Sequence, residues 1–309
     1  LGISTVSAAA GWPDRPLTLV VPFGPGSSPD QMARVITEKA SSILGQPIVV
    51  QNRPGASGNL GTNVIAKSKP DGYTFGVSIT GPMVNNTLIY KDLPYDPKKD
   101  LVPLTLAVHQ PNILVVPANS PIKTLPQLLD AMRDPKSQFN FPSTGTGTIA
   151  HLSVELLLQR VGGKAVHVPY ASSPAAVTAL LSGDAQFAAL PPVAVMPMVN
   201  DGRLRALAVV FSEPTDMFPN IPTLAEQGVK DIEGSGWIGF VAPAGIPDEI
   251  RKTLTDALIK AIHDPEVEKR LKAQYMLPVG NQPEEFARYM DDELKRWGPI
   301  IKRLNLSVN

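Results

Sequence analysis

LTLVVPFGPGSSPDQMARVITEKA, residues 17–40, places an apolar run, a glycine-rich turn and a helix pattern in immediate succession. The apolar run predicts a buried strand. Ser28 is a suitable N-cap for the helix, Pro29 fits its first position, and Gln31 completes a capping box with Ser28. Because a helix start presents unpaired N–H groups and the positive end of the helix dipole, this unit predicts a site for a small anion.

The same strand–turn–helix pattern returns in FNFPSTGTGTIAHLSVELLLQ, residues 139–159. Gly145 and Gly147 occupy its turn, and Thr148 is the expected cap of the helix. If two such helix starts face each other, they form an anion site that needs neither Arg nor Lys.

Two further turns follow the pattern. Ser172 begins a Ser-Ser-Pro sequence like that of residues 27–29, again ahead of an apolar helix, and Ser78 and Thr80 precede a glycine after a strand. In open α/β sheets, ligands bind at the carboxyl ends of the strands, where all four turns are expected to lie.

Strands and helices alternate along the chain, which predicts an α/β protein with mostly parallel sheets covered by helices. Beyond Pro247 the pattern is helical, and we expect no further strand there. The expected strands are 17–21, 47–51, 74–79, 104–108, 112–116, 139–142, 166–168, 186–190, 205–210 and 237–241. The expected helices are 29–44, 58–67, 124–133, 148–161, 174–182, 222–227, 248–263, 265–273 and 283–303.

The composition excludes several classes of function. The 28 Lys and Arg residues balance 28 Asp and Glu residues, so nothing favours nucleic acid or an anionic membrane surface as a partner. The absence of Cys excludes disulfides and thiolate metal sites, and the four His residues form no metal-ligand pair. We therefore expect no metal and no cofactor.

The first eleven residues, LGISTVSAAAG, are small and apolar. They resemble the end of a secretory signal, which predicts export to the periplasm. A flexible N-terminus is the alternative. No other apolar run approaches the roughly 18 residues that a transmembrane helix needs.

Two side chains beside the turns are further candidates. Asp30, in the first turn of its helix, either compensates the helix dipole or contacts the ligand. His151 lies off the apolar face of its helix, which favours a place in the pocket.

Enzymatic activity is the weaker hypothesis. A serine hydrolase using Ser27 or Ser28 is the alternative function, but neither lies in a G-x-S-x-G sequence. The glycine turns also lack the Lys of a phosphate-binding P-loop and the third glycine of a dinucleotide site.

Taken together, these motifs resemble the Bug receptor family, the periplasmic substrate-binding proteins of tripartite tricarboxylate transporters. VQNRPGASGNLG, residues 50–61, is the most specific matching stretch. It lies within the matching stretch 45–75, and the other matching stretches are 12–34, 143–157, 168–187, 202–209, 221–228 and 237–247, in the order typical of the family.

The resemblance implies a type II, two-domain Venus-flytrap fold that acts as a monomer and hands a small carboxylate to membrane transporter subunits. It implies that the turns 23–28 and 143–148, one from each domain, grip the carboxylate through N–H groups, hydroxyls and water. The expected ligand-binding residues are Phe23, Gly24, Gly26, Ser27, Ser28, Asp30, Ser78, Thr80, Ser143, Thr144, Gly145, Thr146, Gly147, Thr148, His151, Tyr170, Ser172 and Pro192.

The sequence departs from the family at two places. Ser27 and Ser28 replace the usual Gly-Gly pair, which makes the first turn more polar, and residues 190–192 lack the polar residue often found there. With Phe23 and Tyr170 nearby, an aromatic or longer aliphatic dicarboxylate fits, and a tricarboxylate stays open as an alternative.

The chain must cross between the domains twice if both glycine turns are to face one cleft. We therefore expect one domain to combine residues 12–103 with 227–309, and the other to span 104–226.

Overall fold

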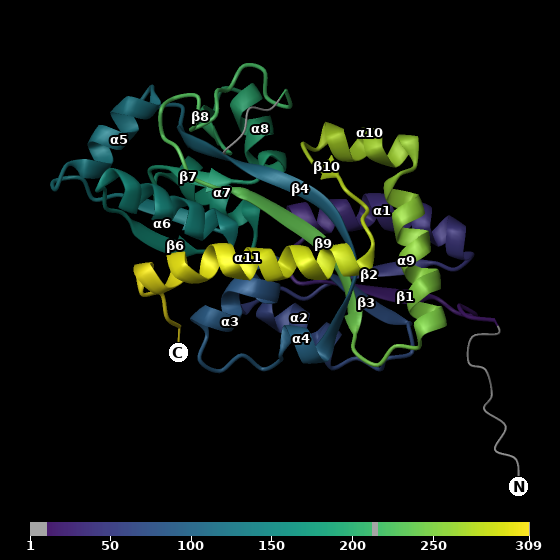
Figure 1. Ribbon diagram of the computed structural model, residues 1–309. Helices are drawn as coiled ribbons and strands as arrows, with labels where there is room; N and C mark the ends of the chain where they lie inside the picture. The colour runs from purple at the N-terminus through teal and green to yellow at the C-terminus, as the bar shows by residue number, and fades with distance from the viewer. Residues whose placement is uncertain (1–10, 212–215, 309) are drawn as a thin grey trace, which may run out of the picture.

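The computed structural model describes residues 11–211 and 216–308. Within this part of the chain a central sheet is flanked by helices, as Figure 1 shows. The expected signal remnant falls on residues 1–11, of which 1–10 lie outside the described residues. None of the helices in the described ranges combines the length and the apolar character needed to cross a bilayer.

The central sheet is built around a parallel group of three strands. Strand β1 has β2 and β3 as parallel neighbours, and β9 joins the other side of β3 in the antiparallel direction. The order of strands is β10 (Leu277–Pro278), β4 (Leu101–Pro117), β9 (Ser235–Pro243), β3 (Thr74–Ile79), β1 (Leu17–Val21) and β2 (Ile48–Asn52).

A second group of strands adjoins the far half of β4. Strands β7 (Ala188–Leu190) and β8 (Leu204–Val210) both pair with it in the antiparallel direction. Strands β5 (Asn140–Ser143) and β6 (Val166–Pro169) form a separate parallel pair.

The expectation of mostly parallel sheets is wrong for the described strands. All neighbours of β4 run antiparallel to it, as does β9 against β3. The long strands β4 and β9 pass through the molecule in opposite directions, and this non-local pairing leaves no signal in the alternation of strands and helices.

Strand β4 also merges two expected strands, 104–108 and 112–116, into one. The residues between these two expected strands are also paired, because β4 changes its pairing partner from β9 to β8 there. Pro111 lies opposite Ser235 of β9, and Asn112 lies opposite Val210 of β8.

The helices cover both groups of strands. In Figure 1, α11 runs as a long yellow rod across the front, past β4 toward α6. The α-helices are α1 (Ser28–Leu44), α2 (Asn59–Ala66), α3 (Asn86–Ile89), α4 (Pro97–Asp100), α5 (Leu125–Arg133), α6 (Ile149–Val161), α7 (Ser173–Ser182), α8 (Pro192–Asn200), α9 (Asp248–Ile262), α10 (Pro265–Ala273) and α11 (Pro283–Leu304). Two shorter elements are a 3₁₀ turn at Ala56–Gly58 and a π-helix, η2, at Gly81–Asn85.

Several individual elements differ from the expectation, including η2, α3 and α4, which were not expected. Residues 222–227 form turns, because Thr223 makes a β-bridge to Val209 and the Leu224 N–H donates to the Val209 carbonyl. Helix α8 was not expected, since its prolines resemble breaks. The short strand β10 lies in the C-terminal region for which no strand was expected.

Two large apolar clusters lie on either side of the middle of β4. The first packs Leu19 and Phe75 of the central sheet against α1 and α9. The second surrounds Leu114 and Phe141. The division into 12–103 with 227–309 and 104–226 stays a prediction, although the change of partners along β4 falls near that boundary.

A smaller apolar cluster connects α3, α6 and α11. Trp297 of α11 lies at its centre, fully buried against Ile89 of α3 and Ile149 and Leu152 of α6. The Trp297 indole N–H donates to the Glu293 carboxylate at 3.2 Å, and burial raises the pKa of Glu293. Helix α11 is therefore fixed to both α3 and α6.

We expect Trp297→Ala to lower the free energy of unfolding by about 3–5 kcal/mol, because it leaves a cavity where α3, α6 and α11 meet. Urea denaturation measures the change. Leu88→Ala, at a residue of α3 that is 46% exposed, is the control and should change stability by no more than about 0.5 kcal/mol. Equal losses in the two variants would show that this cluster does not hold α11.

Candidate functional site

A cavity of about 60 Å³ lies where the starts of several helices meet β4 and β9. Ser28, Ile149 and Ser173, the first residues of α1, α6 and α7, all line it. The N–H group of a first helical residue has no acceptor within its own helix. Three positive helix ends and their free N–H groups therefore converge on one small space.

Two buried hydroxyls on the cavity wall have no hydrogen-bond partner among the residues that the structure describes. They are the Oγ of Ser28, a residue only 2% exposed, and the Oγ1 of Thr80, only 1% exposed. Because buried polar groups are nearly always hydrogen-bonded, these hydroxyls indicate an occupant that accepts hydrogen bonds.

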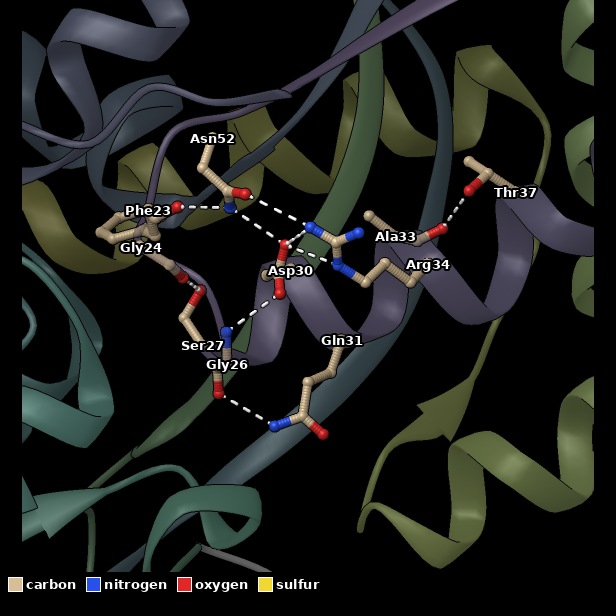
Figure 2. A network of polar contacts seen from close by, with 10 residues as sticks. All are labelled: Phe23, Gly24, Gly26, Ser27, Asp30, Gln31, Ala33, Arg34, Thr37 and Asn52. Atoms are coloured by element: carbon tan, nitrogen blue, oxygen red, sulfur yellow. Dashed lines mark hydrogen bonds and ion pairs between the residues drawn. The ribbon is translucent and has the colours of Figure 1, made fainter. Parts of the chain in front are cut away.

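The α1 turn, residues 23–28, is held by its own contacts, as Figure 2 shows. Asp30 accepts a hydrogen bond from the Gly26 N–H at 2.9 Å. The other oxygen of Asp30 accepts from Asn52 Nδ2 at 2.9 Å and from Arg34 Nε at 3.1 Å. These contacts fix the turn at the start of α1.

The expected capping box is wrong in its residues. Ser27 is the N-cap of α1, and its hydroxyl donates to the Gly24 carbonyl at 2.7 Å. Gln31 instead donates through Nε2 to the Gly26 carbonyl, while Asp30 accepts from the Gly26 N–H. The carboxylate is the stronger acceptor, which explains why it takes the backbone donor.

Asp30 therefore serves the turn, and it does not line the cavity. Burial alone would raise the pKa of this carboxyl, but hydrogen bonds from Arg34, Gly26 and Asn52 together with the Arg34 charge lower it. Of the two roles considered for Asp30, the structure supports stabilisation of the helix start.

The α6 turn, residues 143–148, is fixed in a similar way. The Thr148 hydroxyl donates to the Gly145 carbonyl at 2.7 Å, and Thr144 Oγ1 donates to Thr148 Oγ1 at 3.3 Å. Ser143 Oγ accepts from the Gly145 N–H at 3.0 Å and lies 2.6 Å from His167 Nε2. The side chains thus fix the turn by hydrogen bonds within it, while the N–H groups at the start of α6 stay available to a ligand.

The placement of His151 in the pocket is wrong. Its ring is buried behind the α6 turn, where Nδ1 accepts from the Gly147 N–H at 3.1 Å. The ring stacks on that of His167, with 3.8 Å between the centroids. Burial and, to a smaller degree, the neighbouring His151 lower the pKa of His167 to about 3. Helical periodicity did not reveal that β6 brings a second imidazole to this face.

The cavity brings together a third of the expected ligand-binding residues. Those on its wall are Phe23, Ser27, Ser28, Thr80, Thr144 and Thr148. The other residues of the two turns, Gly24, Gly26, Ser143, Gly145, Thr146 and Gly147, set the backbone without lining the cavity.

Four further expected residues also lie off the cavity wall. Ser78 bonds to Thr62 at 3.1 Å between hydroxyl oxygens, and Ser172 caps α7 by accepting from the Ala175 N–H. Tyr170 packs against a core cluster. Pro192 is buried one residue beyond Pro191, which does line the cavity.

Sequence reasoning missed the part of the cavity that β4 and β9 provide. Gln110 and Asn112 of β4 and residues 236–238 of β9 all line it. Two amides within a mostly apolar strand were the available signal. The remaining wall residues that were not expected are Pro29, Ile79, Ile149, Ala150, Ser173 and Pro191.

No charged side chain of the described residues lines this cavity. The same ranges hold no group of three side chains that could bind a metal ion. The hydrolase alternative also lacks support, because the Ser27 hydroxyl is bound to a carbonyl and the Ser28 hydroxyl has no base as a partner. The wall can bind an anion only through neutral donors.

The α6 turn is also in close contact with the segment that follows β3. Asn85 Nδ2 donates to the Gly147 carbonyl at 2.9 Å. A Cβ atom at Gly147 would lie 2.3 Å from Asn86 Oδ1, and one at Gly145 would lie 2.6 Å from Ser57 Oγ. Only glycine allows the α6 turn to come this close to the segment after β3 and to the 3₁₀ turn that holds Ser57.

The sequence profile described as "Tripartite tricarboxylate transporter family receptor" matches residues 32–306. Three solved structures cover most of the chain. The periplasmic binding protein BugD is 26% identical, with a TM-score of 0.91 over 96% of this chain and 99% of its own. R. palustris Rpa4515, solved with adipate, is 31% identical, with a TM-score of 0.91 over 96% and 99%.

MatC from Rhodopseudomonas palustris, solved with bound malate, is 29% identical, with a TM-score of 0.88 over 94% of this chain and 100% of its own. These similarities confirm the resemblance to the Bug receptors and the α/β periplasmic-binding-protein fold. The similar proteins are solute-binding proteins rather than enzymes.

We expect Gly147→Ala to cost at least about 1 kcal/mol more stability than Gly162→Ala, because of overpacking. Both glycines have positive φ, +84° and +69°, so both variants carry similar backbone strain. A Cβ at Gly162, the C-cap of the same helix, meets nothing within 4 Å. Urea denaturation of both variants gives the comparison, and equal losses would contradict a tight contact at Gly147.

We expect Asp30→Asn to lower the free energy of unfolding by about 1.5–3 kcal/mol at pH 7, because hydrogen bonds to a charged group are lost. The lowered pKa means that this stabilisation is present above the ordinary value of 3.8 and is lost as the pH falls through the folded pKa. Denaturation of the wild-type protein and the Asn variant from pH 7 down into acid should show that the difference in their free energies of unfolding decreases. Asp201→Asn, at an exposed residue, is the control.

Proposed function

The chain belongs to the tripartite tricarboxylate transporter receptor family, and on this basis we propose that it captures a small carboxylate in the periplasm. It then delivers that carboxylate, as a monomer, to the membrane subunits of a tripartite transporter. The observation that carries the proposal is the convergence of three helix starts and two unpartnered hydroxyls on one uncharged cavity.

The two glycine turns have complementary roles in this proposal. The α1 turn directs the N–H and hydroxyl of Ser28 to the carboxylate, and the α6 turn directs the N–H groups of Ile149 and Ala150. Helix starts attract anions without a full positive charge. When the cavity is empty, no buried cation is left without a partner, so the unliganded protein has no uncompensated charge to bury.

Binding is coupled to closure if the two turns belong to different lobes. We propose that residues 12–103 with 227–309 form one lobe and 104–226 the other. The carboxylate then has its full set of donors only when the lobes meet, so the ligand favours the closed state. The Asn85–Gly147 hydrogen bond and the glycine contacts around it support a closed arrangement.

The wall also limits the size and character of the ligand. The cavity is small, which favours a compact ligand. Phe23, Ile79 and Pro191 supply apolar surface for a carbon skeleton. Similar proteins were solved with adipate and malate, so a short aliphatic dicarboxylate, or an aromatic acid of comparable length, is the class to test first.

Thermal denaturation in the presence of a panel of carboxylates tests the function. A ligand at one hundred times its dissociation constant should stabilise the protein by about 2.7 kcal/mol. The panel should contain mono-, di- and tricarboxylates of matched carbon skeletons. A panel without any stabilising acid would contradict the proposal.

We expect Ser28→Ala to weaken carboxylate binding roughly tenfold or more, because a hydrogen bond to a charged ligand contributes about 1.5–3 kcal/mol. Isothermal titration calorimetry measures the change. Ser42→Ala, at an exposed residue of the same helix, is the matched control. Arg53→Ala should also bind normally, and its failure to bind would instead indicate a salt bridge.

A further inference from the structure

Two amide side chains on the cavity wall have no role in the proposed carboxylate grip. Gln110 and Asn112 are two residues apart on β4, so they belong to the same face of the strand. Opposite Gln110, β9 contributes Gly236, whose missing side chain leaves room above the strands, whereas Asn112 lies opposite Val210 of β8. The two amides therefore form a polar patch on the β4 side of the cavity wall, which we call the β4 floor.

The hydrogen bonds of Gln110 fix the orientation of its amide. Its Nε2 donates to the backbone carbonyls of Gln274 at 3.2 Å and Tyr275 at 3.4 Å. These acceptors require the nitrogen on that side, which leaves Oε1 as a free acceptor. Gln110 is only 5% exposed.

Asn112 is also buried, at 4% exposed. Its backbone N–H donates to the Gly234 carbonyl at 3.0 Å, but its side-chain amide makes no hydrogen bond to the described residues. Because Asn112 lines the cavity, its unpaired amide is available to a group bound there.

The chemistry of these two amides restricts what that partner can be. Gln110 Oε1 can only accept, so it repels a carboxylate and attracts an O–H group. A hydroxyl can donate to Gln110 Oε1 and accept from Asn112 Nδ2 at the same time. A carboxylate placed against Gln110 Oε1 would instead bring two acceptors together, with no hydrogen to share between them.

We propose that Gln110 and Asn112 make the cavity selective for hydroxy acids over the same acids without the hydroxyl. This inference rests on the proposed carboxylate-binding function. It assigns the helix starts to one carboxylate and the β4 amides to the hydroxyl, so the two parts of the wall recognise different groups of one ligand.

Calorimetry on the wild-type protein with matched pairs of acids tests the selectivity directly. Malate is compared with succinate, and 2-hydroxyglutarate with glutarate. We expect the hydroxy acid to bind about tenfold more tightly in at least one pair, on the scale of a neutral hydrogen bond. Equal or tighter binding of the unsubstituted acids in both pairs would overturn the selectivity while leaving the carboxylate function intact. If no acid binds, both proposals fail.

Variants identify the residues responsible. In Asn112→Leu and Gln110→Met, the ratio of the two affinities should fall to near one. Asn112→Leu is the more direct variant, because Gln110 also supports the backbone at residues 274–275. Asn63→Leu, an amide of α2 outside the cavity, is the matched control and should retain the wild-type ratio. A ratio that stays at the wild-type value in both β4 variants would assign the selectivity elsewhere.

Discussion

The first N–H groups of a helix cannot be satisfied by the helix itself, and the site depends on this constraint. Helices α1, α6 and α7 all direct their starts to the same cavity, where no charged side chain of the described residues is present. This unmet hydrogen-bonding capacity destabilises the empty protein, and in the proposed function the bound carboxylate satisfies it. The two tightly bonded turns hold these starts in place before any ligand arrives.

The fold supports this convergence through elements that span it. Strand β4 passes from the β9 pairing to the β8 pairing without a break, and α11 packs through Trp297 on both α3 and α6. Because Ile149 belongs to the Trp297 cluster and also lines the cavity, the wall of the site is continuous with the packing of α11.

The parts of the candidate site that could be predicted from the sequence are those formed by residues close together in the chain. A glycine turn with a Ser or Thr cap is a local signal, and it placed Ser28 and Thr148 on the wall. The part of the wall that β4 and β9 provide was missed because the direction of a strand side chain depends on pairing with distant strands. His151 was misplaced for a similar reason, since its partner His167 comes from β6. The antiparallel pairing of β9 between β3 and β4 likewise leaves no local trace.

The uncharged wall also bears on how fast a ligand arrives. A net charge attracts an ion over a Debye length, about 8 Å at physiological ionic strength, whereas a helix dipole acts mainly at its end. The chain as a whole has a formal net charge of zero, so it adds no long-range attraction of its own. Encounter with an anion is consequently governed by diffusion and by the shape of the opening, and its rate should vary little with salt. A receptor built this way would bind its ligand at a similar association rate at low and at high ionic strength.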